Sequence, residues 1–361
     1  MTALLGTIRD KKILWFLVFV PITLIAAQTT SDQAILLFVL SVASIVPLAA
    51  LLSHATEAVA AKTGDSIGGL LNATLGNLTE LIIALTALRA GEYLLVKASI
   101  AGAIVTNTLF MMGAAFLIGG LRHKVQEFSK VNARVQLSLL LMATVALLVP
   151  SAIGAADKVE LPDSLSVGLS LLLIGGYALG LLFSLGTHRD FMTTEHEHEE
   201  GEEHWSMPLS LITLAVTTVL VALVSEIFIE SMTEAADSLG ISPAFTGFIV
   251  VALVGAAAEM TTAFSAAAKD RLDMAVGIAF GSAAQIAMFV APVLVLLSYV
   301  IGPQPMSLEF WPGAVVMMLV AVLSAAHVTA GGRSAWFLGA LLLLVYAVFA
   351  LTLFVMPVAL P

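Results

Sequence analysis

The chain has 361 residues, of which 60% are hydrophobic and 11% are charged, and its mean hydropathy is +1.04. These values exclude a soluble domain of this size and indicate an integral membrane protein. Much of the formal net charge of -10 comes from one acidic run, TTEHEHEEGEEHW, near residues 193–205. The absence of cysteine excludes disulfides, thiolate metal sites and cysteine nucleophiles.

Apolar segments with short polar breaks between them follow one another along the whole chain. A helix needs about 20 such residues to cross the hydrocarbon core, and the alternation typical of barrel strands is absent. The sequence therefore predicts an all-α integral membrane protein with eleven transmembrane helices. We expect them near residues 12–29, 33–53, 66–89, 95–119, 135–154, 165–187, 208–230, 244–268, 273–301, 311–329 and 335–358.

The lysine and arginine residues fall unevenly on the loops between these helices. Of the fifteen, Arg89, Lys97 and Lys158 lie on one side, and the other twelve lie on the side of the N-terminus. Cytosolic loops of membrane proteins carry the excess of positive charge. The distribution therefore predicts a cytosolic N-terminus and an external C-terminus, and we expect a prokaryotic inner membrane.

Two short motifs repeat at a fixed distance. GNLTE at 76–80 and GAAAE at 255–259 are 179 residues apart, and the same offset carries Gly102 onto Gly281. We interpret this as an inverted repeat, because an odd number of helices in each half makes the halves run in opposite directions. The expected divisions are an N-terminal helix at 1–31, a five-helix repeat at 32–188, an acidic linker at 189–207 and a second five-helix repeat at 208–361.

A glutamate lies near the centre of the third and the eighth predicted helix. Glu80 is about fourteen residues into its helix and Glu259 about fifteen. A carboxylate at the middle of a bilayer costs several kcal/mol unless it faces a cavity, a partner or a cation. Related segments of inverted repeats meet at the midplane, where transporters bind their substrates. We therefore expect both glutamates to bind one cation.

Amide side chains surround these glutamates in the sequence. Asn77 lies three residues before Glu80, and Asn107 and Gln285 lie just beyond the paired glycines of the adjoining helices. Calcium takes six to eight oxygen ligands, which are carboxylates, amide and backbone carbonyls and water. The set predicts a calcium site, with manganese or another divalent cation as an alternative.

The same two carboxylates can also take up protons. Glu80 and Glu259 cannot bind calcium and protons at once, so the ions compete for the site. If the site can change sides only when it is neutralised, alternating access becomes obligatory calcium/proton exchange. This predicts a secondary transporter that exports calcium with the proton gradient, and it predicts no enzyme and no resident cofactor.

Further polar residues lie nearer the ends of the helices. Glu57, Glu226 and Glu230 are candidates for the access pathway, and their alternative role is that of solvated helix ends. His196, His198 and His204 lie among glutamates in the linker. We interpret that loop as a cation-concentrating linker, with a regulatory metal site as the alternative.

The segments GGLLNATLGNLTELI at 68–82 and FTGFIVVALVGAAAEM followed by GIAFGSAAQIAMFVAPV resemble the two signatures of the calcium/proton exchanger (CAX) family of the calcium/cation antiporter superfamily. The similarity covers nearly the whole chain after the first helix. The resemblance implies that Glu80 and Glu259 are the essential ligands, that the three amides assist, and that Glu57, Glu226 and Glu230 line the access routes.

The chain departs from the family pattern in the second signature, where Ala256 and Met260 stand in place of an asparagine and a histidine, and Gly339 stands where a glutamate is common. These departures affect ion preference more than fold. The alternatives are a sodium-coupled or a manganese- or zinc-selective exchanger of the same superfamily and, from another class, a cation channel. Calcium, protons and the lipid bilayer are the expected partners, and nucleic acid is not; the sequence predicts no oligomeric state.

Overall fold

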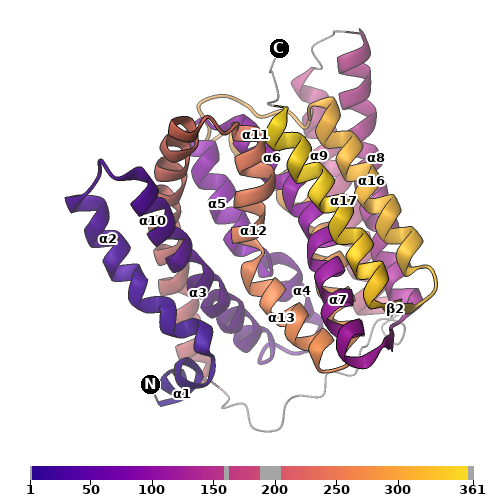
Figure 1. Ribbon diagram of the computed structural model, residues 1–361, viewed down its shortest axis with the longest axis horizontal. Coiled ribbons are helices and arrows are strands. Elements are labelled where there is room, and N and C mark those ends of the chain that lie inside the picture. The colour runs from indigo at the N-terminus through magenta and orange to yellow at the C-terminus, as the bar shows by residue number, and fades with distance from the viewer. Residues whose placement is uncertain (1, 158–161, 188–204, 357–361) are drawn as a thin grey trace.

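The computed structural model describes residues 2–157, 162–187 and 205–356, and these residues form a bundle of long helices (Figure 1). The helices of the first half are α1 (Thr2–Asp10), η1 (Lys12–Val18), α2 (Phe19–Thr29), α3 (Ala34–Ala60), α4 (Asp65–Leu75), α5 (Leu78–Arg89), α6 (Tyr93–Val105), η2 (Thr106–Met111), α7 (Met112–His123), α8 (Lys130–Asp157), α9 (Asp163–Leu181) and η3 (Leu182–Thr187). Those of the second half are α10 (Met207–Leu239), α11 (Pro243–Phe245), η5 (Thr246–Val251), α12 (Ala252–Gly255), α13 (Ala257–Ala268), α14 (Leu272–Gln285), η6 (Ile286–Val290), α15 (Ala291–Ser298), α16 (Pro312–Thr329) and α17 (Trp336–Val355).

Nine helical stretches within these described residues are long and apolar enough to cross a membrane. Two further stretches pass the same test only as bent pairs. Residues 67–75 and 78–89 meet at an angle of 40°, and residues 243–255 and 257–268 meet at 59°. The helices expected near 66–89 and 244–268 are therefore each broken at the glycine motif, and each is one candidate span only if its two segments are taken together. The bundle has nine to eleven candidate spans.

Element boundaries in the two halves coincide at the spacing of the sequence motifs. Helices α5 (78–89) and α13 (257–268) begin and end 179 residues apart. With this offset, the breaks in the two bent pairs also fall at corresponding positions. The same spacing relates the ends of α3 and α10, the starts of α6 and α14, and the starts of α7 and α15 (Ala60 and Leu239, Tyr93 and Leu272, Met112 and Ala291). The motif repeat thus extends to the local geometry of the chain.

Helices of the first half pack mainly on helices of the second. The largest contacts join α3 to α10, α7 to α17, α8 to α16 and α6 to η5. Two short strands that the sequence did not predict, β1 (Val125–Glu127) and β2 (Arg333–Ala335), also pair across the halves. They are antiparallel, with Gln126 opposite Ser334, and Arg333 forms an ion pair with Glu127 at 2.6 Å.

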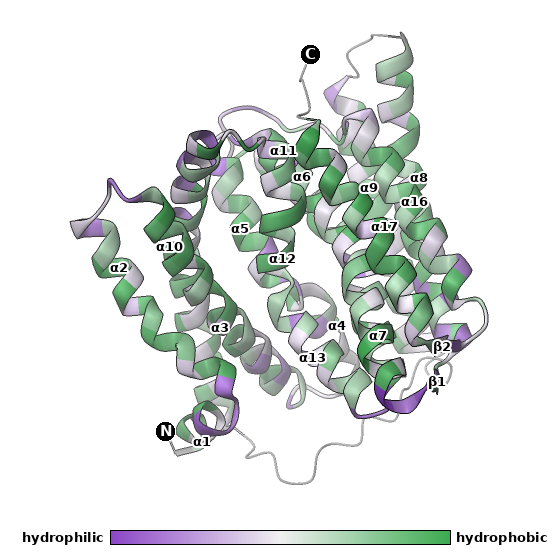
Figure 2. Ribbon diagram, viewed as in Figure 1, coloured by the Kyte–Doolittle hydropathy of each residue, from purple (hydrophilic) through white to green (hydrophobic). Residues whose placement is uncertain are grey.

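The outer surface of the bundle is apolar over most of its length, and polar residues gather at its two ends (Figure 2). Large side chains such as Leu172, Val300 and Val355 are more than 60% exposed. A surface of this kind is suited to lipid, which supports the interpretation of the long helices as membrane spans. One end carries α1, the end of α13 and the β1–β2 pair (Figure 1).

Candidate functional site

Glu80 and Glu259 each lie in the first turn of a half-helix, just after a break. Glu80 is the third residue of α5, and Glu259 is the third residue of α13. The first backbone N–H groups of a helix have no partner inside the helix, so a break of this kind favours an anionic side chain beside it. Both side chains line one cavity, and their charges act on each other. The structure therefore brings together the two carboxylates that the repeat singled out.

The glycine that precedes each break leaves room for a polar side chain from another element. A Cβ atom on Gly255 would lie 3.0 Å from Cγ of Glu80, and a Cβ on Gly76 would lie 3.3 Å from Oε1 of Gln285. The two glycines thus do more than loosen their helices, because each lets a candidate ligand lie directly against the broken backbone. Backbone carbonyls at broken helix ends are themselves cation ligands in transporters.

The three amide side chains expected at the site are buried there. Asn77, Asn107 and Gln285 are 1%, 0% and 6% exposed. Ser282, in α14, joins two of them, since its Oγ donates to Oδ1 of Asn77 at 2.7 Å and accepts from Nδ2 of Asn107 at 2.9 Å. The Ser282 hydroxyl also lies beside the Glu259 carboxylate. We call Asn77, Ser282 and Asn107 the polar triad.

Each of the five predicted ligands keeps one buried polar atom without a hydrogen-bond partner. These atoms are Oε1 of Glu80, Oε2 of Glu259, Oδ1 of Asn107, Nδ2 of Asn77 and Nε2 of Gln285. Buried polar atoms are nearly always paired in proteins, so a cluster of unpaired ones marks a place for a ligand or for water. Three of the five are oxygens, the ligand type that hard divalent cations prefer. No three Asp, Glu or His side chains converge anywhere in the described ranges, so this site depends on two carboxylates and on amides.

Two cavities meet at Glu80. The first extends from Glu80 past Ile83 and Ser99 and is otherwise lined by apolar residues. The second is lined by Glu80, Glu259 and Ser53, among others. Ser53 donates to Oε1 of the exposed Glu57 at 3.2 Å, which joins Glu57 to a residue that lines this second cavity. The role of Glu57 in an access route stays a prediction.

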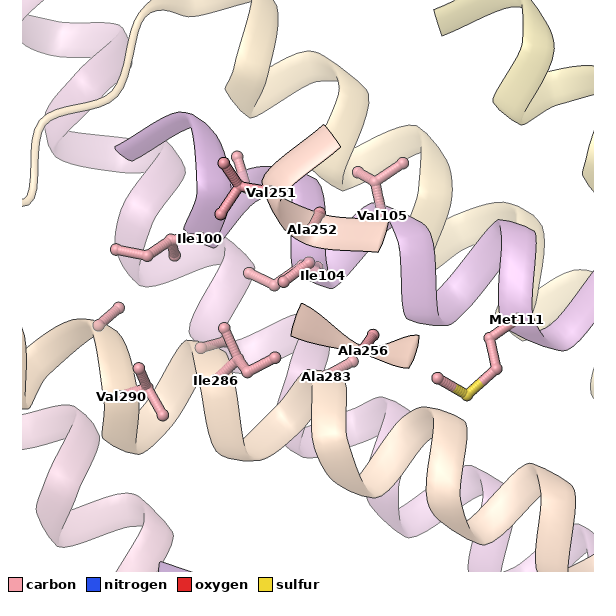
Figure 3. Packing of buried hydrophobic residues seen from close by; sticks show 14 of the residues in the cluster. Ile100, Ile104, Val105, Met111, Val251, Ala252, Ala256, Ala283, Ile286 and Val290 are labelled. Atoms are coloured by element: carbon pink, nitrogen blue, oxygen red, sulfur yellow. The ribbon is translucent and has the colours of Figure 1, made fainter. Parts of the chain in front are cut away.

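The two halves of the site are chemically unequal. The repeat offset of 179 residues relates the polar triad of Asn77, Ser282 and Asn107 to Ala256, Ala103 and Ile286, in that order. These three residues are 0%, 4% and 1% exposed. Figure 3 shows Ala256 with Ile104 above it, Ala283 below it and Met111 to its right, all of them apolar. The hydrogen-bonded side of the site is thus matched by an apolar side at the related positions.

The remaining predicted site residues lie away from the glutamates. Glu226 and Glu230 are on the exposed face of α10, outside both cavities, and Glu226 forms an ion pair with Arg89 at 3.2 Å. Their role in an access route stays a prediction. His196, His198 and His204 fall outside the described residues.

Sequence reasoning missed two polar residues of the site, Ser282 and Ser53. It also missed Tyr177, outside both cavities, whose hydroxyl donates to the backbone oxygen of Ala73 at 2.7 Å near the end of α4. The motif GSAAQ placed Ser282 one turn before Gln285, which is a weak signal. Nothing in the sequence connects Tyr177 to residue 73.

Comparisons with known proteins agree with the resemblance noted above. The family model described as sodium/calcium exchanger protein matches residues 33–186 and 209–355. A Ca(2+)/H(+) antiporter of Aphanothece halophytica is 40% identical over 97% of this chain and 98% of the relative, and the Ca(2+)/H(+) antiporter ChaA of Bacillus subtilis is 40% identical over 93% and 97%.

Solved structures have the same fold. The structure of native YfkE superimposes with a TM-score of 0.80 at 36% identity, over 94% of this chain and 99% of that one. The H+/Ca2+ exchanger CAX superimposes with a TM-score of 0.75 at 16% identity, over 97% and 89%. The predicted resemblance to calcium/proton exchangers is thereby confirmed. This chain belongs to the sodium/calcium exchanger protein family.

Proposed function

We propose that this protein exchanges calcium for protons across a membrane by alternating access. The observation that carries the proposal is the pair Glu80 and Glu259, each in the first turn after a helix break and both lining one cavity. The relatives named Ca(2+)/H(+) antiporter cover nearly the whole chain and support the same function. The protein is a transporter and not an enzyme.

The arrangement of helices in the proposal is two inverted five-helix repeats after an N-terminal helix, eleven spans in all. The element boundaries that recur at 179 positions support it. In such a repeat, one state opens the site to one side of the membrane and the mirrored state opens it to the other. We propose that the end with α1 and the β1–β2 pair is cytosolic, and the excess of Lys and Arg in the loops on that side supports this orientation.

In the proposed cycle, calcium is the substrate and this chain supplies its ligands. Glu80 and Glu259 neutralise the charge, and the oxygens of Asn77, Asn107 and Gln285 add neutral ligands, with water completing the set of six to eight. Calcium leaves on the external side, and protons then bind the two carboxylates. With both carboxylates protonated, the protein changes back to the state in which the site is open to the cytosol. Release of the protons there leaves the site ready for the next calcium ion.

Transport in everted membrane vesicles tests the proposal. An imposed proton gradient should drive uptake of radioactive calcium by the unmodified protein, and Glu80→Gln or Glu259→Gln should abolish it, because Gln cannot carry the proton or the charge. Glu127→Gln, which alters an exposed carboxylate of β1, is the matched control and should transport normally. Retained uptake in either site variant would refute the assignment.

Ion selectivity is the finer part of the proposal. Oxygen ligands favour calcium or manganese over zinc, which prefers histidine and thiolate. Competition of manganese, zinc and sodium with calcium uptake measures the preference. Calcium flux that depends on sodium and not on the proton gradient would identify a sodium-coupled exchanger, and flux without exchange would identify a channel.

A further inference from the structure

A second polar feature leads toward the site between α8 and α14, on a side that neither cavity touches. At the end of the bundle where β1 precedes α8, Oδ1 of Asp273 accepts from the backbone N–H of Ser129 at 2.6 Å. Oγ of Ser129 accepts from the N–H of Asn132, and Oδ1 of Asn132 accepts from Nε2 of Gln136 at 2.9 Å. Spacings of three and four residues place Asn132 and Gln136 on one stripe of α8 with the start of the helix.

The stripe of α14 that faces α8 contains two glycines and ends at Gln285, one of the predicted ligands. Asp273, Gly277, Gly281 and Gln285 are four residues apart and share one side of the helix. A Cβ on Gly281 would lie 3.8 Å from Oε1 of Gln136, so the stripe faces α8 at this level. A Cβ on Gly277 would have no other atom within 4 Å. Gly277 is partly exposed, so the stripe of α14 is open one turn before Gly281.

Two unpaired polar groups mark this interface as a place for water. Oε1 of Gln136 is buried and accepts no hydrogen bond, and Gln285, which is 6% exposed, has an unpaired Nε2 at the inner end of the stripe. Buried polar groups without protein partners are commonly satisfied by water, and polar side chains within a membrane usually face water or one another.

The other half of the chain provides an internal comparison. There α16 packs on α6 as α8 packs on α14. The buried residues in the first half of α16 are Ala314, Val315, Met317 and Met318, all apolar. Since the fold forms with apolar residues in the related interface, packing alone does not require the polar row on α8.

We propose that the α8–α14 interface holds a file of water that conducts protons between the Asp273 end and the ion site, separately from the cavity that admits the cation. This inference rests on the proposed calcium/proton exchange. When a protonated glutamate releases its proton, the carboxyl O–H bond breaks and a water accepts the proton. Each water then passes a proton to the next water, and the water at the Asp273 end releases a proton to the solvent. The carboxylate that remains is free to bind calcium.

Thiol labelling tests for the water directly, because the natural chain has no cysteine. Gly277→Cys adds a side chain where there is free space, and Ile278→Cys, a partly exposed position of the same helix that lies off the stripe, is the matched control. A water-soluble methanethiosulfonate reacts with thiols in water and is applied to everted vesicles. We expect modification of the Gly277→Cys protein and not of the control. Absence of modification at position 277 would overturn the proposal, whichever ion the protein carries.

Transport separates a proton path from a packing role. Gln136→Leu should lose most of its proton-driven calcium uptake while it retains exchange of radioactive for unlabelled calcium, which moves no protons, with an unchanged KM for calcium. Ser138→Leu, on the exposed face of α8, should change neither process. Equal loss of both processes in the Gln136→Leu protein, or loss of neither, would overturn the proposal. Absence of proton-driven uptake in the unmodified protein would instead refute the proposed function.

Discussion

Gly255 allows the closest approach of Glu80 to a broken helix, so an added methyl group there should weaken calcium binding. In Gly255→Ala the new Cβ would lie 3.0 Å from Cγ, 3.6 Å from Cδ and 3.7 Å from Oε1 of Glu80. The favourable separation of two carbon atoms is about 3.5–4.0 Å. The glutamate must therefore move by several tenths of an ångström, or its helix must.

The size of the effect follows from the cost of that movement. A side chain forced about 30° from its preferred torsion angle costs about 0.5–1.5 kcal/mol. If this cost falls on the calcium-bound geometry of Glu80, the affinity falls about two- to twelvefold. The carboxylate remains present, so transport should continue with a raised KM, in contrast to its loss in Glu80→Gln.

The measurement is the KM for calcium in proton-driven uptake by everted vesicles, with thermal unfolding in detergent as a check on folding. Gly168→Ala is the matched control, because Gly168 lies in α9 and a Cβ there would meet no atom within 4 Å. That change should leave the KM unaltered. An unaltered KM for Gly255→Ala as well would refute the role assigned to the glycine.

Three other substitutions test contacts around the site and at the end of the bundle that carries α1. Ser282→Ala removes both hydrogen bonds of the polar triad and should cost about 1–3 kcal/mol of unfolding free energy and raise the KM for calcium; equal values for both proteins would contradict its place in the site. Tyr177→Phe should cost about 0.5–1.5 kcal/mol in the same unfolding assay, by loss of its bond to Ala73, and an unchanged stability would argue against that bond. Trp205→Ala empties a fully buried position beside α1 and should cost about 3–5 kcal/mol and expose α1 to protease, so continued protection would show that the contact is dispensable.

The sequence predicted the carboxylate pair and its amides because charged residues in apolar helices are rare and costly, so Glu80 and Glu259 stand out against their surroundings. The fixed spacing of the two motifs then indicated that the glutamates meet. The helix breaks could not be predicted in the same way, because a glycine in a membrane helix serves close packing as readily as it ends a helix.

The polar triad was only partly predictable for a related reason. A buried serine in a helix commonly bonds the backbone one turn earlier, as Ser170 does with the oxygen of Ser166. The bonds of Ser282 to two asparagines depend on how α14 packs against η2 and approaches the break before α5, and no local pattern reports that packing. The β1–β2 pair is likewise set by tertiary contact, since three residues are too few to give a recognisable alternation.

The interlocking of the two halves has a consequence for how the protein is made. Asn77 and Asn107 enter the membrane early in synthesis, but Ser282 is made 205 and 175 residues later. Until α14 arrives, these amides and Glu80 lack their final neighbours, and the faces of α3, α7 and α8 that later meet α10, α17 and α16 lie open. The first half must therefore remain in the bilayer as an incomplete bundle, with buried polar groups that lack partners until the second half is made.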